Sequence, residues 1–145
     1  MNELSFEISA GNSQARAIVP LIDSIALTDL ISSFETEKSM EPSGGYGGLV
    51  PAYYKYGPLD HYFMGDTRVL GLSDNGKVAL LGCECGEVGC WALLARVIVD
   101  GQYVHWTDFE QPHRSARDYS SFGPFTFEKP KYLQVLQELI QQLTR

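Results

Sequence analysis

Two nearly continuous apolar runs in the second half of the chain constrain the fold more than any other feature. The first follows the hairpin signal Asp74-Asn75-Gly76, and the second ends at the two-residue turn signal Asp100-Gly101, after which the chain runs back. Runs this apolar and this short are typical of strands covered on both faces. The predicted meander has four antiparallel strands, at 68–72, 77–83, 90–99 and 102–109.

The rest of the chain adds two helices and further strands. Alternation from Leu4 to Ile8 predicts a strand, and its returning partner is expected to stop at Pro20. A short edge strand is predicted at 123–127. Apolar residues at helical spacing predict helices at about 26–37 and 130–143. We therefore expect a single α+β domain, residues 1–145, in which an antiparallel meander sheet of five or six strands is packed by these two helices.

Simple hairpin pairing assigns the side chains to two faces of this sheet. If Asp100-Gly101 is a two-residue turn, Arg96 faces His105 and Trp91 faces Glu110. The opposite face then forms the main core. The expected core residues are Leu93, Ala95, Val97, Val104 and Trp106.

The cysteines fall together in this register. A four-residue loop between Cys85 and Cys90 places these two opposite each other, on the same face as Cys83. His105 lies six residues along the strand from Cys90, about 20 Å away, so it cannot share a site with the thiols. His113 follows the end of the last strand and is the imidazole expected beside them.

Zinc binding is one interpretation of this cluster. Cys83, Cys85, Cys90 and His113 would supply three thiolates and one imidazole, a ligand set that zinc accepts in a tetrahedron. The alternative is that the thiols are small buried side chains in a tight hairpin.

Cysteine-dependent hydrolysis is another interpretation of the same residues. Cys90 or Cys85 would be the nucleophile and His113 the base, and Asp108 or Glu110 would orient the ring. Apolar neighbours oppose this chemistry, because they raise the pKa of a thiol.

A basic cluster follows the last strand. Arg114 and Arg117 are three residues apart beside Tyr119, which places both guanidinium groups on one side of a helical turn. This arrangement suits a carboxylate or a phosphate. The alternative is that both arginines pair with nearby carboxylates, which are Asp108, Glu110 and Asp118.

Residues 39–66 are rich in glycine and tyrosine. Four glycines surround Tyr46, but the segment lacks the Lys-Ser/Thr of a phosphate-binding loop. Long irregular segments in compact domains are often functional. Tyr46, Tyr53 and Tyr54 are therefore candidates for a ligand-binding or partner surface. The alternative is that these rings cover the sheet.

Composition narrows the partners. With a net charge of −7, the chain repels phosphate backbones and anionic lipid, so neither nucleic acid nor membrane is expected. It has no apolar run of about 20 residues, and its first residues lack signal-peptide features, so a cytoplasmic location is expected. We expect a small acidic binding or interaction module, with or without structural zinc, for an unknown protein or a small anionic ligand. The hydrolase is the alternative.

Four motifs resemble those of a group of short bacterial proteins of unknown function. They are GGYxGLVP at 44–51, CxCGxxGCW at 83–91, FxQPHR at 109–114 and YSxFGPFxF at 119–127. The resemblance covers most of the chain from about residue 20 onward. It implies a bacterial cytoplasmic protein and assigns no activity, fold or catalytic residue.

Overall fold

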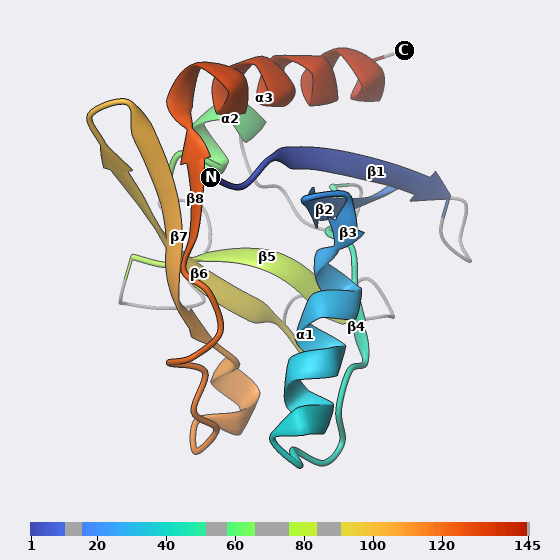
Figure 1. Cartoon of the computed structure of the whole chain (residues 1–145). Coiled ribbons are helices and arrows are strands. Elements are labelled where there is room, and N and C mark those ends of the chain that lie inside the picture. The colour runs from blue at the N-terminus through green and yellow to red at the C-terminus, as the bar shows by residue number, and fades with distance from the viewer. Residues whose placement is uncertain (11–15, 52–57, 66–75, 84–90, 145) are drawn as a thin grey trace.

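The computed structural model describes residues 1–10, 16–51, 58–65, 76–83 and 91–144 (Figure 1). These residues form two antiparallel sheets and three α-helices. The elements in chain order are β1 (Leu4–Ala10), β2 (Arg16–Ile22), β3 (Ile25–Ala26), α1 (Leu27–Glu37), β4 (Tyr46–Gly47), α2 (Leu59–Tyr62), β5 (Val78–Cys83), β6 (Leu93–Asp100), β7 (Tyr103–Glu110), a 3-10 turn (Pro112–Arg114), β8 (Phe125–Glu128) and α3 (Lys129–Leu143).

The strands lie in two sheets. One has the order β1-β2-β3 and the other β4-β5-β6-β7-β8. The α+β class with antiparallel pairing is therefore confirmed, and the strands of the larger sheet pair in chain order, as in a meander. The expected single sheet is divided in two, and the larger sheet includes β4, which the sequence did not predict. The N-terminal hairpin forms its own sheet, in which β2 pairs with β1 and β3. Ile18 of β2 also exchanges backbone hydrogen bonds of 2.8 and 2.9 Å with Leu49, which follows β4.

The N-terminal hairpin continues further than the sequence predicted. β2 runs through Pro20, which lies opposite Phe6, and ends at Ile22. β3 pairs only with Leu21 and Ile22, so Pro20, which has no N–H, lies outside the β2–β3 ladder. The turn residues 11–13 lie outside the described residues, as does the predicted strand at 68–72.

The β6–β7 hairpin is offset from the predicted register. Asp100 pairs with Tyr103, which moves the turn one residue along the chain. His105 consequently faces Ile98 and not Arg96. Because each partner moves by two positions, His105 and Arg96 still share one face of the sheet.

A bulge changes the pairing at the other end of this hairpin. Beyond Arg96, β7 carries one more residue than β6 before the next pair, and Asp108 has a φ of 53°. Glu110 therefore faces Leu94 and not Trp91, as simple pairing had predicted.

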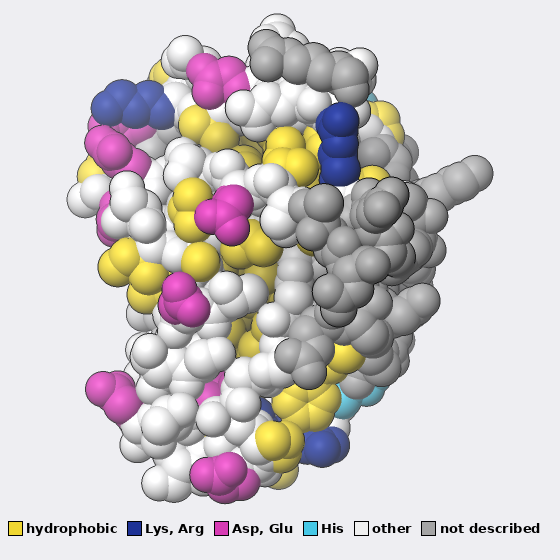
Figure 2. Space-filling model, turned by 90° about the vertical axis from the view of Figure 1, so that its right-hand side faces the viewer, with side chains coloured by type: hydrophobic (Ala, Val, Ile, Leu, Met, Phe, Trp, Pro, Cys, Tyr) yellow, Lys and Arg dark blue, Asp and Glu magenta, His cyan; other side chains and the backbone are white. Residues whose placement is uncertain are grey.

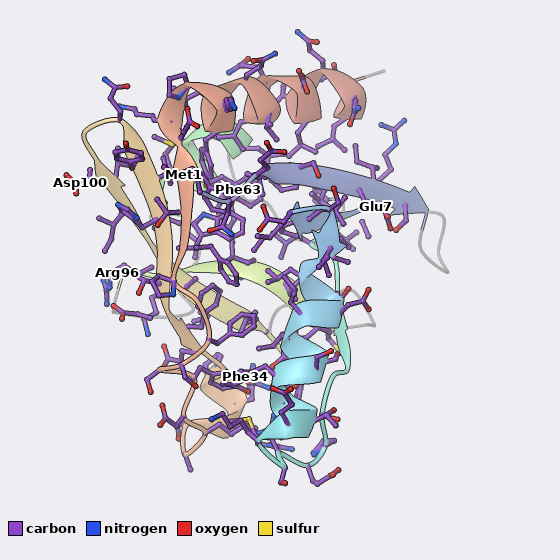
Figure 3. The ribbon with its side chains drawn as sticks, in the orientation of Figure 1. Met1, Glu7, Phe34, Phe63, Arg96 and Asp100 are labelled. Atoms are coloured by element: carbon purple, nitrogen blue, oxygen red, sulfur yellow. The ribbon has the colours of Figure 1, made fainter. Side chains whose placement is uncertain are left out.

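The part of the core at the top of Figure 1 lies between α3, β7 and β8. Trp106 packs edge-on against Phe127 with ring centroids 5.0 Å apart, and its indole N–H donates to the Tyr132 hydroxyl at 2.9 Å. That hydroxyl donates to the backbone carbonyl of Phe63, whose ring packs against Phe6 at 5.1 Å (Figure 3). We call Trp106, Tyr132 and Phe63 the Tyr132 centre.

A second aromatic group closes the lower end beside α1. Phe34 lies between α1 and the segment before β8 in Figure 3, with its ring 5.8 Å from Tyr119 and 5.2 Å from Phe122. Phe122 also packs against Phe109 at 4.8 Å and Phe125 at 5.5 Å. These contacts attach α1 to the chain between β7 and β8.

α1 and α3 lie where the sequence placed helices, within one residue at each end. α3 buries Tyr132, Leu136 and Leu139, whereas Leu133 is 37% exposed. The short helix α2 was not predicted within residues 39–66. None of the described helices combines the length and the apolar character needed to cross a bilayer.

Candidate functional site

Helix α1 carries a carboxylate on its buried face. Leu27, Ile31 and Glu35 follow one another at intervals of four residues, and all three are 0% exposed. A buried carboxylate is tolerated only when it is hydrogen-bonded and paired. The partners of Glu35 therefore show which segments the fold holds together here.

Four groups bind the Glu35 carboxylate. The Gly44 N–H donates to Oε1 at 2.8 Å, and the hydroxyls of Tyr46 and Tyr119 donate to Oε2 at 2.7 and 2.5 Å. Nη1 of Arg117 lies 3.1 Å from the same oxygen. Because these groups come from two distant segments, Glu35 joins both segments to α1. We call these five residues the Glu35 centre.

The Gly44 peptide is held on both sides. Its N–H binds Glu35, and its carbonyl accepts the Trp91 indole N–H at 3.0 Å. Gly44 has a φ of 76°, and a Cβ at this position would lie 2.9 Å from Oγ of Ser32. Both constraints favour glycine, so this residue serves the fit of the loop against α1 and Trp91.

The charge of Arg117 is used inside the fold. Nη1 pairs with Glu35, and Nη2 donates to the Pro42 carbonyl at 2.7 Å. Burial alone lowers the pKa of the Arg117 guanidinium, but the hydrogen bond to Tyr119 and the negative charge of Glu35 raise it overall. Arg117 therefore stays charged and neutralises the carboxylate.

The two tyrosines of the centre stay protonated. Burial, followed by the hydrogen bond to Glu35, raises the pKa of Tyr46 well above its ordinary value. Burial is also the largest cause that raises the pKa of Tyr119. Because a neutral hydroxyl is the form that donates to a carboxylate, these shifts keep both donors in place.

Arg114 has a different environment from Arg117. Its guanidinium carbon lies 4.9 Å from the centroid of the Trp91 ring, and that of Arg117 lies 5.7 Å from the same ring. Arg114 is exposed, and its Nη1 donates to the His113 carbonyl at 3.1 Å. No carboxylate of the described segments pairs with it. Figure 2 shows hydrophobic, basic and histidine side chains gathered at the lower end of one face.

The predicted thiol site falls only partly within the structure. Cys83 ends β5, is half-buried and lies opposite Tyr46 of β4. Cys85 and Cys90 lie outside the described residues. Within the parts of the chain that the structure covers, no three His, Cys, Asp or Glu side chains are arranged to hold a metal ion. The zinc site and the cysteine-dependent hydrolase therefore stay predictions.

The other predicted site residues are divided between surface and interior. His113 is exposed on the 3-10 turn. Tyr46 and Tyr119 are 8% and 3% exposed, and their hydroxyls bind Glu35. Tyr53 and Tyr54 lie outside the described residues.

The carboxylates expected to pair with the two arginines have other partners. The ion pairs here are Arg96–Asp108, Lys77–Glu110 and Arg117–Glu35, each at 3.1 Å. The exposed Asp118 accepts the backbone N–H of Ser120 at 2.9 Å. Among the described residues, neither Arg114 nor Arg117 forms an ion pair with Asp108, Glu110 or Asp118.

Glu35, the residue around which this site is built, was not among the residues predicted from the sequence. A signal was present, because the four-residue spacing from Leu27 and Ile31 places Glu35 on the buried face of α1. A glutamate in line with two buried apolar residues requires buried partners. The sequence does not say that these are residues 44–46 and 117–119.

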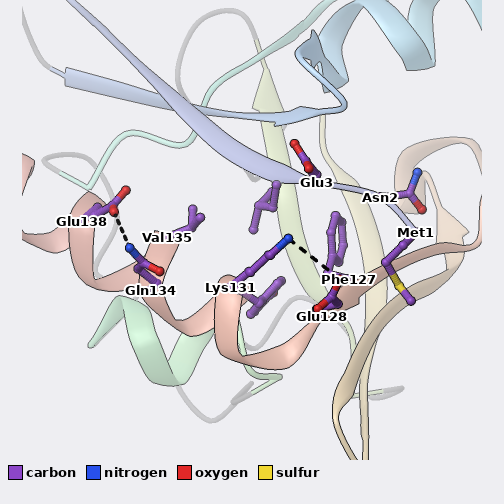
Figure 4. A pocket seen from close by; sticks show the side chains of 11 residues that line it. Met1, Asn2, Glu3, Phe127, Glu128, Lys131, Gln134, Val135 and Glu138 are labelled. Atoms are coloured by element: carbon purple, nitrogen blue, oxygen red, sulfur yellow. Dashed lines mark hydrogen bonds and ion pairs between the residues drawn. The ribbon is translucent and has the colours of Figure 1, made fainter.

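A separate hollow lies between the N-terminal residues and α3 (Figure 4). Its volume is about 360 Å³, and its lining includes the buried Leu4, Phe127 and Tyr132. Lys131 lies 3.9 Å from Glu128 at its edge, and Gln134 donates to Glu138 at 3.3 Å. These side chains already have partners within the chain.

Comparison with models of known protein families, with curated proteins and with solved structures gave no match.

Proposed function

We propose that this chain is a binding module that recognises an anionic group, a carboxylate or a phosphate, at the surface formed by Arg114 and Trp91. The observation that carries the proposal is the guanidinium of Arg114, which lies over an indole ring and has no carboxylate partner in the described chain. A guanidinium has five N–H donors, and contact with an aromatic ring uses none of them, so such a group can still bind an anion.

The platform beneath this arginine supports a binding role. The Trp91 indole donates to Gly44, and Gly44 donates to the buried Glu35. Arg117, bound to the same carboxylate, lies against the same indole ring. A surface fixed before the partner arrives loses less conformational entropy on binding than one that must become ordered.

The charge distribution favours an anionic group at this place over the rest of the surface. The whole chain carries a net charge of −7, and acidic side chains are spread over the left part of the face in Figure 2. An anionic partner is repelled by those regions and attracted by the basic side chains of the 113–117 segment. Such local complementarity selects the orientation of binding more than its strength.

Titration with two anionic probes tests the proposal. Hexaglutamate peptide and inorganic phosphate are added separately to the full chain, and tryptophan fluorescence is recorded. Trp106 is 0% exposed whereas Trp91 is half-buried, so a change reports mainly on Trp91. We expect saturable binding of at least one probe, weakened about tenfold or more by Arg114→Ala, which corresponds to about 1.4 kcal/mol. Added salt should also weaken it.

Arg16→Ala is the matched control. Arg16 is an exposed arginine of β2 whose guanidinium binds the carbonyls of Gln142 and Leu143 in α3. The control should retain the affinity of the parent chain. Failure of both probes to saturate, or equal affinity in Arg114→Ala and the parent chain, contradicts the proposed function.

A further inference from the structure

The amide of Gln111 is buried directly after β7. The residue is 1% exposed, and its Oε1 accepts the backbone N–H of His113 at 2.8 Å. Because the carbonyl oxygen accepts this bond, the orientation of the amide is fixed and Nε2 occupies the other position. The hydrogen bond from the His113 N–H therefore fixes the direction in which the Nε2 group of Gln111 can donate.

Nε2 of Gln111 is a buried donor without a hydrogen-bond partner in the described part of the chain. Buried donors in folded proteins are nearly always paired, since an unpaired one has lost its water and gained nothing in return. An acceptor from outside the chain, either a ligand atom or a water molecule, would complete this group.

Gln111 lines a hollow of about 360 Å³ at the lower end of the larger sheet. This volume lies within the range typical of small-molecule sites. The buried rings of Phe109 and Tyr119 form part of its wall. The charged groups of the lining are those of Lys77, Asp108, Glu110, Arg117 and Asp118.

The charged groups of the hollow differ in their pairing. The Lys77 ammonium binds Glu110 at 3.1 Å, so these two charges compensate each other. Asp118 has no ion-pair partner in the described segments; its carboxylate accepts the Ser120 N–H at 2.9 Å. The hydrogen bonds from Ser120 lower the pKa of Asp118, so its carboxylate is ionised at neutral pH. The other two charged groups of the lining are paired, Asp108 with Arg96 and Arg117 with Glu35. The charge of Lys38 also acts on Asp118, but no ion pair forms between them in the described segments. The hollow thus offers one unused donor and one carboxylate outside any described ion pair.

We propose that this hollow binds a small ligand that carries both a carboxylate or carbonyl oxygen and an ammonium group, as an α-amino acid does. The ligand oxygen accepts the N–H of Gln111 Nε2, and the ammonium group binds the Asp118 carboxylate. Each partner supplies what the other lacks: the buried donor gains an acceptor, and the carboxylate outside any described ion pair gains a positive charge at hydrogen-bond distance.

This inference goes beyond the proposed anion-binding function and does not depend on it. Arg114 and Trp91 do not line the hollow, whereas Arg117, which lies against Trp91, lines it and is paired with Glu35. Either proposal therefore fails without affecting the other, and Arg114→Ala should leave binding in the hollow unchanged.

The test is a titration of the isotope-labelled full chain with each of the twenty common L-amino acids, followed by NMR. Acetate and methylammonium serve as half-probes that carry only the oxygen or only the cation. We expect at least one amino acid to saturate and to shift the side-chain N–H signals of Gln111. Both half-probes should bind at least tenfold more weakly.

Two variants and one control locate the binding. Gln111→Glu keeps an oxygen for the His113 N–H but removes the donor, and Asp118→Asn removes the charge at an exposed position where folding is not at risk. Each should weaken binding at least tenfold. Gln134→Glu makes the same chemical change in the hollow beside α3, which has the same volume, and should have no effect.

Three outcomes overturn the inference. The first is that no amino acid saturates, in which case the Gln111 donor binds water only. The second is that Asp118→Asn binds with the affinity of the parent chain. The third is that Gln134→Glu abolishes binding, which would place the ligand beside α3.

Discussion

The Tyr132 centre and the Glu35 centre both contain buried polar groups that are hydrogen-bonded, but they differ in charge. In the Tyr132 centre every group is neutral: Trp106 donates to the Tyr132 hydroxyl, which donates to the Phe63 carbonyl. In the Glu35 centre a carboxylate and a guanidinium are both buried, with side-chain exposures of 0% and 9%.

The difference follows from the segments that each centre joins. Around Tyr132 the backbone is mostly regular, with α3, β7 and β8 satisfying their own peptide groups. The segments at Glu35 have little regular structure, apart from the two-residue β4 and the 3-10 turn. Charged side chains therefore connect the irregular segments at Glu35, whereas backbone hydrogen bonds connect the elements around Tyr132. Removing one of these charged side chains should lower the free energy of unfolding more than removing a neutral group of the Tyr132 centre.

Removing the carboxylate of Glu35 should give the largest effect. Glu35→Ala leaves the largely buried Arg117 guanidinium without its counter-charge, and breaking such a pair costs about 3–5 kcal/mol. Urea denaturation followed by circular dichroism measures the change in unfolding free energy. Glu37→Ala, an exposed position on the same helix, should change it by less than about 0.5 kcal/mol. Similar losses for the two variants would show that the buried pair is not what holds this end together.

Removing the hydroxyl of Tyr132 should give an intermediate effect. Tyr132→Phe leaves the Trp106 N–H and the Phe63 carbonyl without this partner, at about 1–3 kcal/mol for a buried group. The same denaturation experiment measures it, with Tyr103→Phe at a position 42% exposed as control. A loss equal to that of Glu35→Ala would remove the distinction between neutral and charged centres.

Alkaline pH should give the smallest and most gradual effect. Burial raises the pKa of Tyr46 and of Tyr132 above the ordinary value of about 10. Above that pH the unfolded chain releases these protons while the folded chain keeps them. The contribution of these tyrosines to stability is therefore constant below about pH 9 and falls as the pH rises further.

Denaturation at pH 8 and pH 10.5 tests this dependence. Each tyrosine should contribute a loss of about 1 kcal/mol or less over this interval. Tyr46→Phe and Tyr132→Phe should each reduce the loss by that share. If either variant leaves the alkaline loss unchanged, the corresponding hydroxyl titrates normally in the folded chain.

The regular elements were predictable because their signals are local. Apolar spacing in residues 27–37 and 129–143 fixes the two long helices, and alternation fixes the N-terminal strands. The register of β6 and β7 was less accessible, since the bulge at Asp108 depends on how the sheet packs and not on a turn signal. The site was least accessible: Glu35 and Arg117 are 82 residues apart, and no local pattern pairs them.

That separation has a consequence for how the chain is made. During synthesis, α1 with Glu35 leaves the ribosome before Arg117 and Tyr119 have been added to the chain. Contacts of such long range form late because the intervening chain must first close the loop. The N-terminal half is therefore synthesised before the residue that neutralises Glu35. It can reach its native arrangement only after the last third of the polypeptide has been added.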